Sequence, residues 1–218
     1  MYQQTEVVIV HGLWHQPAHF DQLAAQLRRL GASVRVPRLH RGSLVADTAV
    51  VQEAVDGCLR PPVVLGHSYG GSVITGLERV CHLMYVAAFV PAAGESGAML
   101  GGPSALVNAA IRHNDDGSTS IQPERAREVL YADCSAADSA RATSLLVPQQ
   151  PGHGRGVPRR IAWKTNESTY ILCERDRALS PVLQRQMAGR CTKIVSLNSS
   201  HSPFISQPEW LTRRILEV

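Results

Sequence analysis

Short runs of β-branched and other apolar residues alternate with helical patterns along the first ninety residues of this chain. A run such as Val7-Val8-Ile9-Val10 is typical of a strand that is buried on both faces. The pattern predicts strands at residues 7–10, 33–36, 63–65 and 83–86, and helices at 20–30, 44–59 and 72–80 between them. Crossovers between parallel strands are almost always right-handed, so this alternation predicts a parallel sheet with helices on both faces.

The alternation stops at residues 92–167, which contain Gly and Pro residues and short helical stretches at 123–132 and 135–146, but no convincing strand. It resumes with strands at 170–173 and 193–197, a helix around 181–189 and a final helix from about Pro208. We therefore predict an α/β protein with a mostly parallel, doubly wound sheet of about six strands. The predicted domains are a core, residues 1–91 and 168–218, and an insertion after the fourth strand, residues 92–167.

Length and charge exclude several classes of protein. The 218 residues fit one domain, and the net charge of +4 comes mainly from scattered arginines without interleaved aromatic residues, so we expect no nucleic-acid partner. No apolar run approaches the roughly 20 residues that cross a bilayer, and the first residues lack a signal-peptide pattern. We expect a cytoplasmic protein without a membrane partner. The five cysteines form no CxxC pair, so neither a disulfide framework nor a metal site is expected.

The sequence Gly66-His67-Ser68-Tyr69-Gly70 directly follows the third predicted strand and opens a helix. A G-x-S-x-G pattern alone is weak evidence, but this context is that of a nucleophilic serine on a sharp strand-to-helix turn. Small flanking residues make such a turn sterically possible. The alternative is a glycine-rich turn with an incidental serine.

A serine hydroxyl needs a positioned base to act as a nucleophile at neutral pH. His201 follows the last predicted strand, where a loop at the carboxyl edge of the sheet can reach Ser68. Asp176 follows the fifth predicted strand and would orient His201, which gives the order Ser, Asp, His along the chain. Glu174 is the second candidate for the acid, and a surface ion pair with a neighbouring arginine is the alternative for Asp176.

The tetrahedral intermediate of such a reaction needs backbone donors for its oxyanion. We expect these donors to be the amides of Tyr69 and of Leu13, in the loop that follows the first strand. The residues expected to contact substrate are Gly12, Trp14, His15 and Tyr69. Ordinary core packing is the alternative for Leu13 and Trp14.

Four segments resemble, in order, the α/β-hydrolases grouped with plant methyl esterases and hydroxynitrile lyases, and more closely the small bacterial esterases of that group. They are HGLWH (11–15), GHSYGG (66–71), ERDRALSP (174–181) and SSHSPF (199–204). The similarity covers the whole chain and is weakest across residues 92–167. It implies the α/β-hydrolase fold and a carboxylic-ester hydrolase without metal or organic cofactor. It also implies that residues 92–167, here called the cap segment, form a lid over the active site. Residues 131–134 (YADC) resemble a recurring part of that lid, without an assigned role.

Three departures from the family pattern matter. The chain starts almost directly at its first parallel strand, so the antiparallel hairpin of larger hydrolases is expected to be missing or reduced. Ser202 stands where the plant esterases usually have Met and the lyases Lys, and Gly12 stands where the lyases have Thr. Because cyanohydrin cleavage relies on that lysine, its absence argues against lyase activity.

The sequence thus favours a serine esterase acting on a small to medium, mostly apolar ester. Lactone opening, C–C bond hydrolysis or acyl transfer on the same residues is the alternative, and a lyase or a non-catalytic ligand-binding protein is less favoured. Oligomeric state is left open between monomer and homodimer. Apolar residues expected in the lid or pocket are Met99, Leu100, Leu106 and Trp163.

Overall fold

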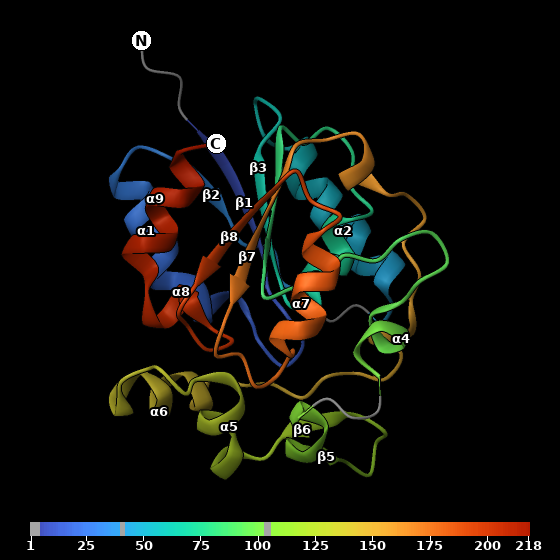
Figure 1. Ribbon diagram of the computed structural model, residues 1–218, viewed down its shortest axis with the longest axis vertical. Helices are drawn as coiled ribbons and strands as arrows, with labels where there is room; N and C mark the ends of the chain where they lie inside the picture. Colours follow the sequence, from blue (N-terminus) through green and yellow to red (C-terminus); the bar gives the residue numbers. More distant parts are fainter. Residues whose placement is uncertain (1–4, 40–41, 103–105) are drawn as a thin grey trace.

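The computed structural model describes residues 5–39, 42–102 and 106–218, without the side chain of Leu106. Its main sheet has six strands in the order β2-β1-β3-β4-β7-β8 (Figure 1). All neighbouring pairs are parallel. The strands are β1 (Glu6–Val10), β2 (Ser33–Arg35), β3 (Val63–His67), β4 (His82–Val86), β7 (Ser168–Cys173) and β8 (Lys193–Leu197). The predicted α/β fold with about six strands is therefore confirmed.

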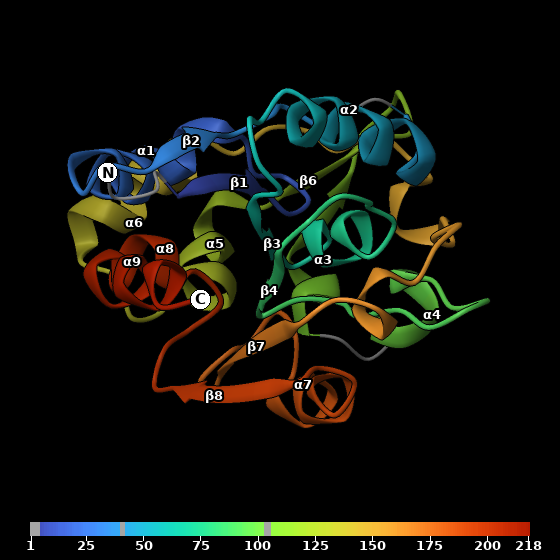
Figure 2. The ribbon, with the colours of Figure 1, turned by 90° about the horizontal axis from the view of Figure 1, so that it is seen from above.

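Helices cover both faces of this sheet (Figure 2). On one face lie α1 (Asp21–Arg29), α8 (Pro203–Ser206) and α9 (Pro208–Leu216), and on the other lie α2 (Leu44–Asp56), α3 (Gly70–Ile74) and α7 (Pro181–Ala188). Alternate residues of β1 point to opposite faces: Val7 and Ile9 pack with α1 and α9, while Val8 and Val10 pack with α2 and α3. This explains the continuous apolar runs of the central strands.

The strand order reverses between β1 and β3, because the chain leaves β1 for one edge of the sheet and returns to β3 on its other side. Loops at the carboxyl ends of such neighbouring strands enclose the crevice in which open α/β sheets bind ligands. Val10 is in register with Gly66, and Cys173 with Leu197, so the loops after β1 and β3 meet, as do those after β7 and β8.

The cap segment leaves the sheet after β4 and crosses the carboxyl ends of the strands before the chain enters β7 (Figure 1). It contains α4 (Gly97–Gly101), η2 (Leu106–Ala110), β5 (Ile111–His113), β6 (Thr119–Ile121), α5 (Pro123–Leu130), α6 (Ala136–Ser144), η3 (His153–Arg155) and η4 (Ala162–Lys164). An apolar cluster of this segment, including Leu130 and Tyr131, packs against Trp14 and Ala178 of the core. The exact boundaries at residues 92 and 167 stay a prediction.

The expectation that the cap segment lacks strands is wrong. β5 and β6 pair as an antiparallel hairpin, with Arg112 opposite Ser120. Each strand has three residues, too few for a period-two pattern to be recognised. The Asn114 side chain also donates to the hydroxyls of Ser118 and Ser120, at 2.8 and 2.9 Å, and so stabilises the turn.

Two helices also differ from the sequence pattern. α3 ends at Ile74 rather than near Val80, and α8 was not predicted. The η1 turn (Pro17–Phe20) precedes α1 and contains Phe20, the first residue of the helix expected there. Among the described residues, no helix is both long enough and apolar enough to cross a membrane.

Candidate active site

Ser68 lies on the turn between β3 and α3 with a left-handed backbone, at a φ of 53°. Non-glycine residues rarely adopt this conformation, and strain of this kind persists only where the surrounding structure imposes it. Here the Ser68 amide donates to the carbonyl of Val86 at 3.2 Å, and its carbonyl accepts from the Phe89 amide at 3.1 Å. The tip of β4 therefore holds the turn that projects the serine.

The glycines around Ser68 are required by close backbone contacts. A Cβ on Gly66 would lie 2.7 Å from the carbonyl oxygen of Gly70. A Cβ on Gly70 or on Gly71 would overlap the carbonyl oxygen of Val10 or of Phe89, respectively. The pattern GHSYGG thus encodes a turn pressed between β1 and the segment after β4.

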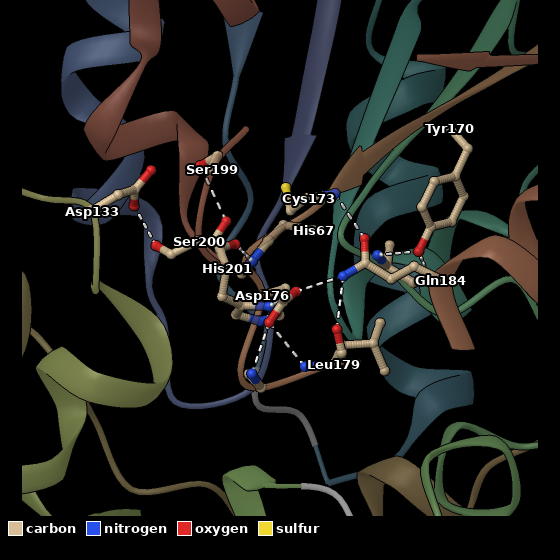
Figure 3. A network of polar contacts seen from close by, with 12 residues as sticks. His67, Asp133, Tyr170, Cys173, Asp176, Leu179, Gln184, Ser199, Ser200 and His201 are labelled. Atoms are coloured by element: carbon tan, nitrogen blue, oxygen red, sulfur yellow. Dashed lines mark hydrogen bonds and ion pairs between the residues drawn. The ribbon is translucent and has the colours of Figure 1, made fainter. Parts of the chain in front are cut away.

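His201 and Asp176 meet at this edge of the sheet, although 25 residues separate them. Nδ1 of His201 lies 2.7 Å from Oδ2 of Asp176, and both side chains are buried. A carboxylate only accepts, so Nδ1 carries the proton and Nε2 of the neutral ring is left with a lone pair. The His201 carbonyl accepts from Nε2 of His67 at 2.9 Å, which fixes the backbone beside the ring (Figure 3).

Three further donors orient the Asp176 carboxylate (Figure 3). Its Oδ1 accepts from the amides of Ala178 and Leu179, at 2.7 and 2.9 Å, in the local turn that Asp favours. Its Oδ2 also accepts from Nε2 of Gln184, at 2.8 Å. Gln184 is fully buried in α7, and its side-chain Oε1 accepts from the amide of Cys173 at 3.0 Å. Sequence reasoning missed Gln184, whose only signal is a polar residue on the buried face of a short helix.

Glu174, the second candidate for the acid, lies elsewhere. Its carboxylate forms an ion pair with Arg185 and accepts from the hydroxyl of Ser196 at 2.9 Å. Arg175, the residue before Asp176, pairs loosely with Asp133 at 3.9 Å. It therefore does not form an ion pair with the Asp176 carboxylate.

The loop after β1 lies against Ser68. A Cβ on Gly12 would be 2.9 Å from the Cβ of Ser68, so only glycine lets the loop approach this closely. Among the described residues, neither the Leu13 amide nor the Tyr69 amide donates to a protein acceptor. Trp14 has a φ of 60°, and its carbonyl accepts from Val147 of the cap segment at 2.9 Å. The loop is therefore held between Ser68 and the cap segment.

A cavity of about 460 Å³ lies between the core and the cap segment, and both Ser68 and His201 line it. Of the predicted substrate contacts, Trp14, His15 and Tyr69 line the cavity as well, whereas Gly12 does not. The rest of the lining includes apolar Leu13, Phe89, Leu130 and Leu179 and polar His113, Gln149, His153 and Arg155.

Of the apolar residues predicted for the lid or pocket, Met99, Leu100 and Trp163 are not in this lining. Met99 is exposed, and Leu100 and Trp163 pack against the core of the protein. The side chain of Leu106 lies outside the described part of the structure. Apolarity alone did not separate pocket residues from packing residues in the cap segment.

A second buried polar cluster connects the cap segment to the residue after Ser68. Oδ2 of Asp47, in α2, accepts from the Tyr69 hydroxyl at 2.9 Å and lies 3.3 Å from Nε2 of His153. Burial, followed by the charge of Asp47, raises the pKa of Tyr69 above its ordinary value, so the phenol stays protonated and donates. Sequence reasoning missed this cluster too.

The environment of His15 and His67 favours the neutral form of both rings. Burial lowers the pKa of both well below its ordinary value, and neighbouring histidines add to this effect. Within the described residues, no group of three or more His, Cys, Asp or Glu side chains is arranged to hold a metal ion.

Because of these two histidines, we predict that the folded protein becomes less stable in mild acid. In the unfolded chain both imidazoles have a pKa of about 6.5 and bind protons that the folded protein excludes. The free energy of unfolding is therefore expected to decrease below about pH 6.5, with a slope approaching about 2.7 kcal/mol per pH unit for two protons. Urea titrations at several pH values between about 7 and 5 measure this slope. A free energy that stays constant across this range would contradict it.

Known proteins similar to this chain agree with the α/β architecture described above. The model of the Alpha/beta hydrolase family matches residues 7–214, so the chain belongs to this family. It is 28% identical to the alpha/beta hydrolase nvfD of Aspergillus novofumigatus, over 96% of this chain and 94% of that one. It is 33% identical to a carbendazim hydrolyzing esterase of Nocardioides, over 41% of this chain and 44% of the relative.

The fold is shared with a pyrethroid hydrolase from Sphingobium faniae, whose crystal structure is known. The TM-score is 0.86 at 24% sequence identity, over 99% of this chain and 97% of the other. At this identity the likeness concerns the fold.

Proposed function

We propose that this α/β-hydrolase is a carboxylic-ester hydrolase in which Ser68 is the nucleophile, His201 the general base and Asp176 the acid that orients it. One observation carries the proposal. The strained Ser68 and the Asp176-bound His201 open onto the same cavity. The partial similarity to a relative named as an esterase supports the same reaction class.

In the first half of the reaction, the Ser68 oxygen attacks the ester carbonyl carbon while Nε2 of His201 takes the hydroxyl proton. Asp176 stabilises the resulting imidazolium through its 2.7 Å contact with Nδ1. The amides of Leu13 and Tyr69 donate to the oxyanion. The C–O bond to the alcohol then breaks, and the departing oxygen takes the proton from His201, which leaves an acyl-Ser68.

In the second half, water attacks the acyl carbon and gives its proton to His201. The bond to Ser68 breaks, the proton returns to the serine oxygen, and the carboxylic acid leaves. No metal or organic cofactor takes part in this scheme.

The cavity suits a small to medium, mostly apolar ester. A volume of about 460 Å³ lies in the range of pockets that bind small organic molecules. Leu13, Trp14 and Leu130 would contact the apolar part of the substrate, and Gln149 and His113 offer hydrogen bonds to a polar group farther along it. Lactones, β-diketones and acyl-transfer substrates would use the same Ser68 and are separated from simple esters by assay.

The test combines turnover with covalent labelling. We expect the protein to hydrolyse p-nitrophenyl esters, with a preference along the series from acetate to octanoate that reflects the pocket, and a fluorophosphonate to attach to Ser68, as located by peptide mass spectrometry. Labelling of Ser68 without hydrolysis of any ester would move the proposal to a lactone or C–C substrate. Absence of both would contradict the nucleophile.

A further inference from the structure

Residues 131–134 form the short connection between α5 and α6 in the cap segment. The Cys134 amide donates to the carbonyl of Tyr131 at 3.1 Å, and the Ser135 hydroxyl accepts from the amide of Asp138 at 3.1 Å to cap α6. These hydrogen bonds fix the conformation of the connection at both of its ends. Its two polar side chains, Tyr131 and Asp133, reach two different loops of the core.

Asp133 contacts the loop that carries His201. Its Oδ1 accepts a hydrogen bond from the hydroxyl of Ser200, the residue before His201, as Figure 3 shows. Its Oδ2 accepts from the hydroxyl of Ser206, at the end of α8, at 3.0 Å. One carboxylate from the cap segment therefore bridges the two sides of the loop on which the base sits.

The bridge is charge-assisted. Burial acts to raise the pKa of Asp133, but hydrogen bonds from neighbouring serines, chiefly Ser200, outweigh it and hold the pKa below its ordinary value. An ionised carboxylate that accepts from hydroxyl groups forms hydrogen bonds roughly twice as strong as neutral ones. Ser200 is buried as well, so water competes little for this contact.

The position of the His201 ring depends on this loop. Its side chain is held through Nδ1 by Asp176, and its backbone through the carbonyl by His67. The backbone on its other side begins at Ser200, which Asp133 holds. A displacement of about 1 Å in a reacting group can cost about 100-fold in rate, so the anchor at Ser200 matters for the reaction.

The same connection braces the loop after β1. The buried Tyr131 has a pKa raised well above its ordinary value by burial, so its hydroxyl stays protonated and donates to Nε2 of His15 at 3.1 Å. Nδ1 of His15 then donates to the carbonyl of Leu13 at 3.0 Å. This turn of the cap segment thus contacts both the loop that carries the base, His201, and the loop that carries an oxyanion amide, that of Leu13.

We propose that Asp133 is a positioning residue for the reaction: through Ser200 and Ser206 it holds the loop that presents His201 to Ser68. The inference rests on the proposed function. Asp133 itself does not touch substrate, and its effect should appear in the chemical step rather than in substrate binding.

The experiment compares Asp133→Ala, Asp133→Asn and Asp138→Ala on the p-nitrophenyl ester that wild type hydrolyses best. Asp138 is the matched control: it lies in the same region, and its carboxylate accepts from the hydroxyl of Ser135, three residues earlier in the chain. We expect Asp133→Ala to lower kcat by about 10- to 100-fold with KM within about threefold. Asp133→Asn, which can still accept from Ser200, should recover most of that loss. Asp138→Ala should keep kcat within about twofold even if its melting temperature falls.

An unchanged kcat in Asp133→Ala, or an equal loss in Asp138→Ala, would overturn the proposal. If Asp133→Ala does not fold, Ser200→Ala removes the same contact from the other side and should lower kcat in the same way; an unchanged kcat there overturns it too.

A spectroscopic readout separates positioning from stability. The far-downfield proton resonance of His201 Nδ1–H should shift or broaden in Asp133→Ala and stay unchanged in Asp138→Ala, and the reverse pattern overturns the proposal. The esterase activity of Ser68→Ala distinguishes the role of Asp133 from the proposed function as a whole. Retained activity in Ser68→Ala would defeat the proposed function. An inactive Ser68→Ala beside a fully active Asp133→Ala would defeat only the role of Asp133.

Discussion

Replacing Ser68 with alanine is expected to lower kcat/KM for ester hydrolysis by about 10⁴- to 10⁶-fold, because the variant lacks the hydroxyl that would form the acyl intermediate. The overall fold should be unchanged, since alanine relieves rather than adds bulk at the turn. Ser72, the next serine along the chain, is a matched control. It is buried in α3, and its hydroxyl has no hydrogen-bond partner among the described residues, so Ser72→Ala should keep its activity.

The pair of variants Ser68→Ala and His201→Ala tests whether the two residues act as a unit. Residues of one catalytic assembly show strongly non-additive losses. The double variant should therefore be no slower than Ser68→Ala alone, and His201→Ala alone should lose about as much. Kinetics of the purified variants with a p-nitrophenyl ester measure this. Multiplied losses in the double variant would mean that His201 does not act through Ser68.

Replacing Gly71 with alanine is expected to lower the free energy of unfolding by about 3 kcal/mol or more, or to prevent folding. A Cβ at this position would overlap the carbonyl oxygen of Phe89 and lie 2.8 Å from the Cβ of Ala88. Neither neighbour can rotate away, because the overlapping atom is backbone and the segment is buried at the tip of β4.

Gly189→Ala is the control for this substitution. Gly189 ends α7 at a φ of −60°, and a Cβ there would lie 3.5 Å from the Gln186 carbonyl, an ordinary contact. Its unfolding free energy should stay within about 1 kcal/mol of wild type. Urea unfolding of both variants gives the comparison, and equal stabilities would show that the turn can relax around an added methyl group.

Much of the architecture could be predicted from the sequence because it depends on local pattern. The continuous apolar runs placed β1, β3 and β7, and the strand-turn-helix context of GHSYGG placed Ser68 at the carboxyl edge of the sheet. The hairpin β5–β6 was missed because three-residue strands carry no readable period. The early end of α3 was missed because the apolar pattern continues beyond Ile74 to Leu77 and Val80, which are buried without being helical.

The candidate site divides in the same way. Ser68, Asp176 and His201 each follow a recognisable strand, so their positions at one edge of a parallel sheet are a consequence of topology. The sequence could not decide with the same certainty between Asp176 and Glu174, which are only two residues apart. That choice depends on tertiary contacts: His201 lies beside Asp176, and Arg185 lies beside Glu174.

The sequence by itself determined the sheet, the strained turn at Ser68 and the order of the three candidate residues, because strand periodicity and turn chemistry are properties of neighbours along the chain. Only the tertiary structure decided which side chains support them. Gln184 reaches Asp176, His153 reaches Asp47, and Asp133 reaches Ser200 across 67 residues of sequence. Hydrogen bonds require donor and acceptor to approach within about 3 Å, and that proximity arises only when the cap segment and the helices pack onto the sheet.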